Sequence, residues 1–90
     1  MNDQRRKAIS LLLDKVTEMR TTVEDLRSEI ETIKDEEQEY FDNMPEGLQG
    51  SEKGDKAGST IDSLDTAVQA MDAIETELEG AETALDEAMS

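Results

Sequence analysis

The first half of the chain carries an uninterrupted heptad pattern of apolar residues. From Ile9 these residues alternate in steps of three and four, at Leu12, Val16, Met19, Val23, Leu26, Ile30 and Ile33, and the spacing continues through Glu37, Tyr40 and Met44. With Ile9 as position a, β-branched residues fill the a positions and mostly Leu or Met fill the d positions, which is typical of a coiled-coil seam. A long helix is therefore predicted, although 34% apolar and 37% charged residues place the chain near the disordered class.

Sequence signals also place the ends of this helix. Asp3 is a candidate N-cap. Pro45 cannot continue a helix and disfavours helical geometry at the preceding residue, so the first helix is predicted over residues 3–43. The turn is predicted over residues 44–51, in a segment rich in glycine.

A second helix is predicted over residues 52–88. Ser51 followed by Glu52 is the preferred N-cap, and Ser59 with Asp62 is the alternative. The seam residues that follow Ala57, with Ile61 as position a, are Ile61, Leu64, Val68, Met71, Leu78 and Leu85. Glu75 and Glu82 occupy two of the a positions, and we expect the neighbouring Ile74 and Ala81 to carry the apolar face there.

Charge patterning predicts how the two helices pair. The chain is expected to be one all-α domain, residues 1–90, folded as an antiparallel two-helix coiled-coil hairpin. Antiparallel coiled coils bring e positions together, and opposite charges then meet at three levels: Arg20 with Glu79, Arg27 with Asp72, and Lys34 with Asp65. Facing seam residues have sequence numbers that add to 101, which requires a turn between Met44 and Ala57. The basic segment 5–7 is expected to lie beside the C-terminal end of the second helix.

Two long helices alone bury little apolar surface, and a chain this short needs further support. We expect a homo-oligomer, a bundle of four or more helices. The predicted oligomer flank consists of small or apolar residues at the g and c positions of the second helix: Ala67, Ala70, Ile74, Ala81, Ala84 and Ala88. The alternative interpretation is that these alanines are only good helix formers on a solvated face.

Composition excludes several kinds of chemistry. The net charge is −15, so direct binding to nucleic acid is disfavoured because both molecules are polyanions. Cysteine and histidine are absent, which removes thiol and imidazole chemistry and the usual zinc ligands. No P-loop or EF-hand spacing is present. We therefore expect no enzyme activity, no catalytic residue, no metal site and no cofactor.

Two surfaces are candidates for binding a protein. The first is an acidic face of carboxylates that the basic e positions do not use: Glu24, Asp25, Glu31, Asp35, Glu39, Asp62, Glu77 and Glu87. Such a face either only confers solubility or imitates a phosphate backbone toward a partner with a basic surface. The second is the tip, with Tyr40, Phe41, Met44 and Leu48, which either plugs the end of the hairpin or binds a partner or ligand.

Around the turn the sequence resembles small acidic helical proteins of phages and prophages. Those proteins carry an N-M/L-P-E-x-L-Q-x-S-E type turn followed by a second helix rich in alanine and acid. The matching residues here are Asn43, Met44, Pro45, Glu46, Leu48, Gln49, Ser51 and Glu52. The resemblance covers the second half of the chain better than the first, and it implies inhibition or sequestration of a host or defence protein.

Three functions are compatible with these sequence features. The first is a non-enzymatic inhibitor or sequestering factor, acting by nucleic-acid mimicry. The second is a structural or assembly coiled coil whose acidity gives only solubility, and the third is an oligomeric sponge that binds a small ligand. No stretch has the apolar length to cross a bilayer and the first residues do not resemble a signal peptide, so we expect no membrane partner and a cytoplasmic location, in the host if the protein is phage-encoded.

Overall fold

The computed structural model describes residues 2–90, and the elements it forms there are helices. They are α1 (Asp3–Asp42), the short α2 (Glu46–Gln49) and α3 (Glu52–Met89). The molecule is a rod of 69 × 14 × 14 Å with a radius of gyration of 20.1 Å, compared with about 12 Å for a compact domain of this length. The predicted all-helical class is confirmed.

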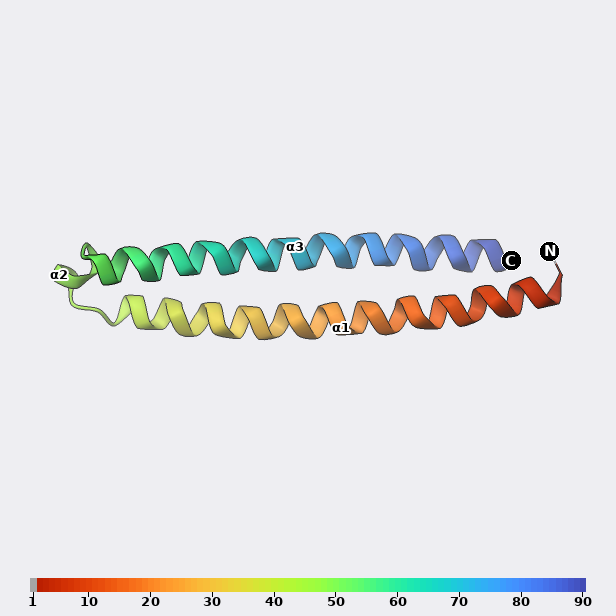
Figure 1. Cartoon of the computed structure of the whole chain (residues 1–90), viewed down its shortest axis with the longest axis horizontal. Helices are drawn as coiled ribbons and strands as arrows, with labels where there is room; N and C mark the ends of the chain where they lie inside the picture. Colours follow the sequence, from red (N-terminus) through yellow and green to blue (C-terminus); the bar gives the residue numbers. More distant parts are fainter. Residues whose placement is uncertain (1) are drawn as a thin grey trace.

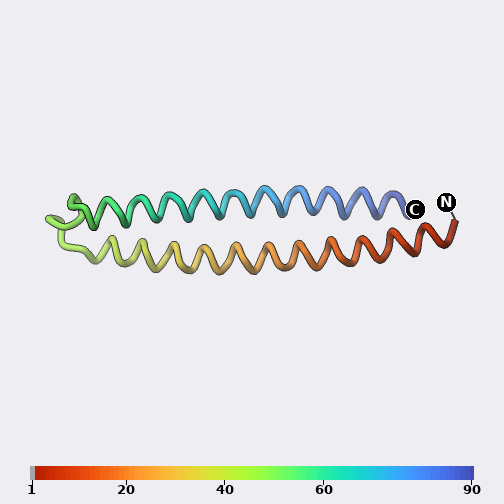
Figure 2. The backbone as a smooth tube through the Cα atoms, viewed as in Figure 1, coloured from red at the N-terminus to blue at the C-terminus, as the bar shows by residue number. Residues whose placement is uncertain are grey.

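The two long helices lie side by side and are joined at one end through α2 (Figure 1). Both chain ends lie at the opposite end of the rod, as the backbone trace also shows (Figure 2). Contacts between distant residues agree with this arrangement: Arg6 Nε donates to the Met89 carbonyl at 3.2 Å, and Lys34 Nζ donates to Asp65 near the turn at 2.9 Å. The Arg6 contact places a cation at the C-terminal end of α3, as predicted.

The N-cap of α1 is Asn2, so the prediction of Asp3 was wrong by one residue. Asn2 has the extended backbone that a cap requires, and its side-chain oxygen accepts a hydrogen bond from Arg5 N at 2.8 Å. Asp3 is the first helical residue instead. A carboxylate remains favourable there because it faces the positive end of the helix dipole.

The turn contains α2, which the sequence did not predict. Pro45 precedes it as the cap, and the Pro45 carbonyl accepts from Leu48 N at 2.8 Å. The Gln49 amide donates to the carbonyls of Phe41 and Met44 at 3.2 and 3.3 Å, which ties α2 to the end of α1. Ser51 is the cap residue of α3, as preferred, but its hydroxyl bonds to the Leu48 carbonyl and caps no N–H of α3.

The seam of α1 differs from the predicted one. From Ile9 onward, the residues at its a and e positions are buried or partly covered: Ile9, Leu13, Val16, Arg20, Val23, Arg27, Ile30, Lys34, Glu37 and Phe41. We call the predicted d positions the d stripe: Leu12, Met19, Leu26, Ile33 and Tyr40. These side chains are 43–55% exposed, so the prediction that they fill the seam was wrong.

In α3 the seam follows the predicted a and d positions, and Gly54, Ala57 and Val68 are buried. Glu75 and Glu82 lie within it, with only 14% and 19% of their side chains exposed. Ile74 is 40% exposed. The expectation that Ile74 and Ala81 carry the apolar face at these levels was therefore wrong for Ile74, because α1 supplies cations to both carboxylates, whereas Ala81 is partly covered.

Glycine is needed at one position in the first turn of α3. A Cβ atom on Gly54 would lie 1.9 Å from the Gln49 carbonyl oxygen, whereas a Cβ on Gly58 would meet nothing within 4 Å. We predict that Gly54→Ala destabilises the fold by about 1–3 kcal/mol through overpacking against backbone. The control Gly58→Ala is expected to stabilise it by about 0.5–1 kcal/mol, because alanine loses less backbone entropy in a helix. Urea unfolding of both variants measures the difference, and equal effects of the two would contradict the close approach.

Candidate interaction surfaces

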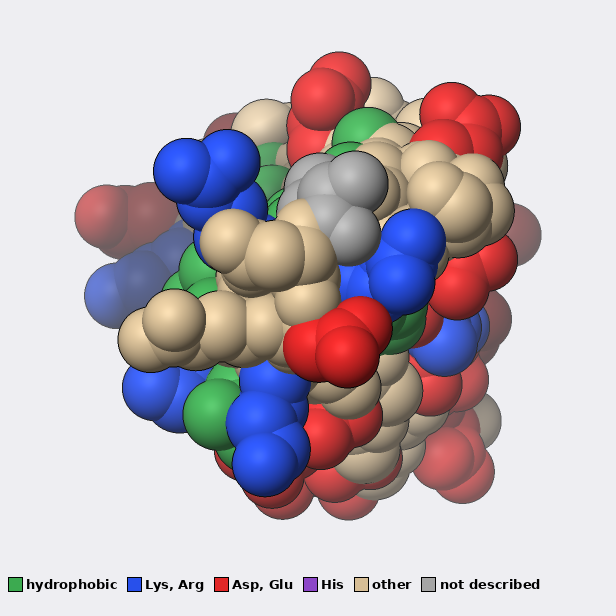
Figure 3. Space-filling model, turned by 90° about the vertical axis from the view of Figure 1, so that its right-hand side faces the viewer, with side chains coloured by type: hydrophobic (Ala, Val, Ile, Leu, Met, Phe, Trp, Pro, Cys, Tyr) green, Lys and Arg blue, Asp and Glu red, His purple; other side chains and the backbone are tan. Residues whose placement is uncertain are grey.

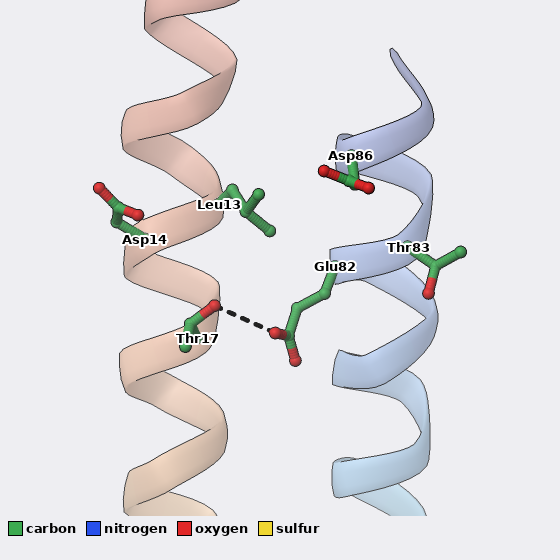
Figure 4. A pocket seen from close by; sticks show the side chains of 6 residues that line it. All are labelled: Leu13, Asp14, Thr17, Glu82, Thr83 and Asp86. Atoms are coloured by element: carbon green, nitrogen blue, oxygen red, sulfur yellow. Dashed lines mark hydrogen bonds between the residues drawn. The ribbon is translucent and has the colours of Figure 1, made fainter. Parts of the chain in front are cut away.

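Ion pairs join the two long helices at three levels of α1, at Arg20, Arg27 and Lys34. Arg20 pairs through Nε with Glu82 of α3 and through Nη1 with Glu24 of its own helix, the latter at 3.0 Å. Thr17 Oγ1 donates to the other Glu82 oxygen at 3.0 Å (Figure 4). The predicted partner of Arg20, Glu79, was wrong. Glu82 replaces it because Arg20 lies inside the rotated seam, beside an a position of α3.

The other two predicted pairs are confirmed. Arg27 Nη1 lies 2.8 Å from Asp72 Oδ1, and Lys34 Nζ lies 2.9 Å from Asp65 Oδ1. Arg27 Nε also lies 3.6 Å from Glu75 Oε1, and within the described part of the chain neither of these two buried atoms has a hydrogen-bond partner. The Arg27 guanidinium thus lies between two carboxylates, that of Asp72 at the edge of the helix pair and that of Glu75 in the seam.

These contacts shift the pKa values of the groups involved. The hydrogen bond to Glu82 raises the pKa of Arg20, the one to Asp72 raises that of Arg27, and the one to Asp65 raises that of Lys34. The same Lys34 contact lowers the pKa of Asp65, first through the hydrogen bond and then through charge attraction. The folded state therefore favours the ionised form of Asp65.

We predict a pH-dependent stability difference between the wild type and Asp65→Asn. Since the pKa of Asp65 is lowered on folding, its contribution is present above the unfolded pKa and is lost as pH falls through the folded pKa. Thermal midpoints should therefore differ at pH 7, and the difference should begin to shrink below about pH 3.8 and disappear as pH falls through the lower pKa of the folded state. Asp62→Asn, at an exposed position one turn away, is the control, and a gap for Asp65→Asn that persists unchanged at low pH would contradict the pairing.

Most of the predicted acidic face is exposed to solvent. Glu24 is the exception, since it is partly covered and paired with Arg20. The exposed members are Asp25, Glu31, Asp35, Glu39, Asp62, Glu77 and Glu87. Residues 24–46 carry ten acidic and two basic groups, whereas basic side chains gather around the open end of the rod (Figure 3). The surplus charge is therefore strongest toward the turn.

A groove near the open end contains several oxygen atoms but no arrangement suited to a cation. It measures about 370 Å³ and is lined by Leu13, Asp14, Thr17, Glu82, Thr83 and Asp86. Figure 4 shows Leu13 directed toward α3, while Asp14 and Thr83 point away from the space between the helices. Residues 2–90 contain no group of three or more acidic side chains placed to hold a metal ion. Glu82, which faces α1, is already engaged by Arg20 and Thr17.

The four predicted tip residues divide into two kinds. Phe41 and Met44 are partly covered, in the manner of a plug, whereas Tyr40 and Leu48 are 50% and 47% exposed. A shallow hollow of about 340 Å³ lies here, lined by Tyr40, Asn43, Met44, Pro45, Leu48 and Lys53. The tip is thus an apolar surface with one cationic side chain at its edge.

The predicted oligomer flank lies on the less covered side of α3. Ala67 and Ala81 are partly covered by the hairpin, and the exposed members are Ala70, Ile74, Ala84 and Ala88. Sequence reasoning missed the larger apolar surface, the d stripe of α1, because it assigned those residues to the seam. Glu75 and Glu82, at two seam positions of α3, are the sequence feature from which this surface could have been predicted.

No protein-family model, curated protein or solved structure matches the chain. The resemblance to phage proteins therefore stays a prediction. Among residues 2–90, neither long helix has an apolar stretch that would carry it across a bilayer.

Proposed function

We propose that the chain is a non-enzymatic interaction protein, an antiparallel coiled-coil hairpin that self-associates and binds a protein with a basic surface. The observation that supports this best is the exposure of seven acidic-face carboxylates on two continuous helices. Long helices hold such charges at fixed spacings, so a partner that matches the spacing gains charge attraction without ordering the rod first.

The positions of the exposed carboxylates on α1 suggest which part of the rod binds the partner. Asp25 and Glu39 are fourteen residues apart on α1, so the part of the acidic face that lies on α1 extends over about 21 Å at 1.5 Å per residue. Intramolecular cations engage Glu24, Asp65, Asp72, Glu75 and Glu82, which leaves the outer carboxylates free to attract a partner. A row of fixed negative charges is also what the basic groove of a nucleic-acid-binding protein recognises, so imitation of a phosphate backbone is the proposed mechanism.

The resemblance at the turn suggests the biological setting. If the chain acts like the phage proteins that it resembles, its partner is a host or defence protein in the host cytoplasm, and binding inhibits or sequesters that protein. The competing interpretations are a purely structural coiled coil and a ligand sponge. A structural coiled coil needs no basic partner, and a sponge needs an enclosed cavity, whereas the hollow at the tip is shallow.

Charge-reversal variants test this proposal. Tagged wild type is expected to retain nucleic-acid-binding proteins from a lysate of the source host at about 50 mM salt, to lose most of them at about 500 mM, and to release them to competing duplex DNA. Asp25→Lys with Asp35→Lys is expected to reduce retention at least about tenfold.

The matched control is Asp14→Lys with Glu18→Lys. These residues are also exposed on α1 and occupy the same heptad positions, f and c, but they lie toward the basic end. The control should retain the partners. Equal retention by both double variants, or retention that survives 500 mM salt, would contradict binding through the acidic face.

A further inference from the structure

The hairpin alone has a very small core. Its buried apolar side chains are Val23, Ala57 and Val68, and its accessible surface is 6475 Å². A compact monomer of 10.0 kDa exposes about 5,200 Å². The chain therefore exposes about 1,300 Å² more than a compact monomer would, and the exposed large apolar side chains show where part of that excess lies.

The geometry of the ion pairs shows which side of the hairpin is apolar. Arg27 pairs with Asp72 and Lys34 with Asp65, so e positions of both helices meet along one flank. Helical residues advance by about 100° each, and the chain direction reverses between the two helices (Figure 1). The d positions of α1 and the g positions of α3 must then lie along the other flank. The two flanks are unlike: one is charged and the other is apolar.

The apolar flank, as we call it, has matched members on the two helices. The sequence numbers of neighbours at the same level add to 100: Leu12 with Ala88, Met19 with Ala81, Leu26 with Ile74, Ile33 with Ala67, and Tyr40 with Thr60. At four of these five levels the α1 residue is large and the α3 residue is small. The flank carries no charged residue at any of the five levels, in a chain of which 37% is charged.

We propose that a second copy of this chain covers the apolar flank and that the two hairpins form a four-helix bundle. This inference rests on the self-association included in the proposed function and assigns the surface responsible. A second copy fits because its α3 offers small side chains where α1 offers large ones, so α1 of each hairpin packs on α3 of the other. The same surface then serves both partners, as an isologous interface requires.

The area of the apolar flank is compatible with a dimer interface. From Leu12 to Tyr40 the d stripe extends over about 42 Å, and the rod is 14 Å wide. Each copy thus offers a face of about 600 Å², and two copies bury about 1,200 Å², at the lower end of specific interfaces. This covers about 600 Å² of each hairpin, about half of the area by which it exceeds a compact monomer. The face has the size that one partner copy covers in a specific interface.

Sedimentation equilibrium of the full chain tests this interface. The wild type is expected to have twice the 10.0 kDa chain mass at about 50 µM, and its thermal midpoint should rise with protein concentration because dissociation accompanies unfolding. Met19→Lys with Leu26→Lys should weaken dimerisation at least about tenfold. Thr21→Lys with Ser28→Lys, which adds the same charge two residues further along at exposed positions, should leave the dimer intact.

The outcomes separate this inference from binding through the acidic face. Loss of the dimer in the flank variant but not in its control supports the interface, whether or not the resulting monomer keeps its helicity. A wild type of single-chain mass with a concentration-independent midpoint overturns it, and so does a flank variant that stays dimeric. Asp25→Lys with Asp35→Lys should remain dimeric, so a loss of partner binding there leaves the dimer interface unaffected.

Discussion

Glu75 and Glu82 impose the constraint on which the arrangement of the two helices depends. Both carboxylates occupy seam positions of α3 and are largely covered, and a covered carboxylate is costly unless a cation and hydrogen bonds compensate it. Arg20 and Thr17 bind the Glu82 carboxylate, whereas Arg27 supplies Glu75 with a charge 3.6 Å away from its buried oxygen but no hydrogen bond to it. Arginine suits this position because its aliphatic stem covers apolar neighbours while the guanidinium reaches a carboxylate.

The orientation of α1 follows from this pairing. When the helix directs its row of e positions into the seam, the d stripe, which lies about 100° away on the helix surface, must leave the seam. The hairpin then carries a charged flank, where the cations meet α3, and an apolar flank, where the d stripe is exposed. The acidic face extends over the outer surfaces of both helices. The proposed self-association and the proposed binding of a basic partner therefore involve different parts of one slender rod.

The sequence predicted the helices well because their signals are local. The heptad spacing from Ile9 and the Pro45 stop depend only on neighbouring residues, and the pairs of Arg27 and Lys34 followed from charge at matched heptad positions. The rotation of α1 could not be derived in the same way. Whether the seam takes up Leu26 or Arg27 depends on the carboxylates that the other helix presents, which is a tertiary effect that outweighs the apolar pattern of a single helix. The short α2 was missed for a similar reason, because the Gln49 amide that holds it binds carbonyls at the end of α1.

A double-mutant cycle measures the rotation of α1 through the pairing of Arg20. Arg20→Met is combined in turn with Glu82→Gln and with Glu79→Gln, and the free energy of unfolding is measured for each single and double variant. The rotated seam predicts a clearly larger coupling free energy between Arg20 and Glu82 than between Arg20 and Glu79, with Glu79 contributing only long-range attraction. A larger coupling free energy to Glu79 would place the d stripe back in the seam and contradict the rotation of α1.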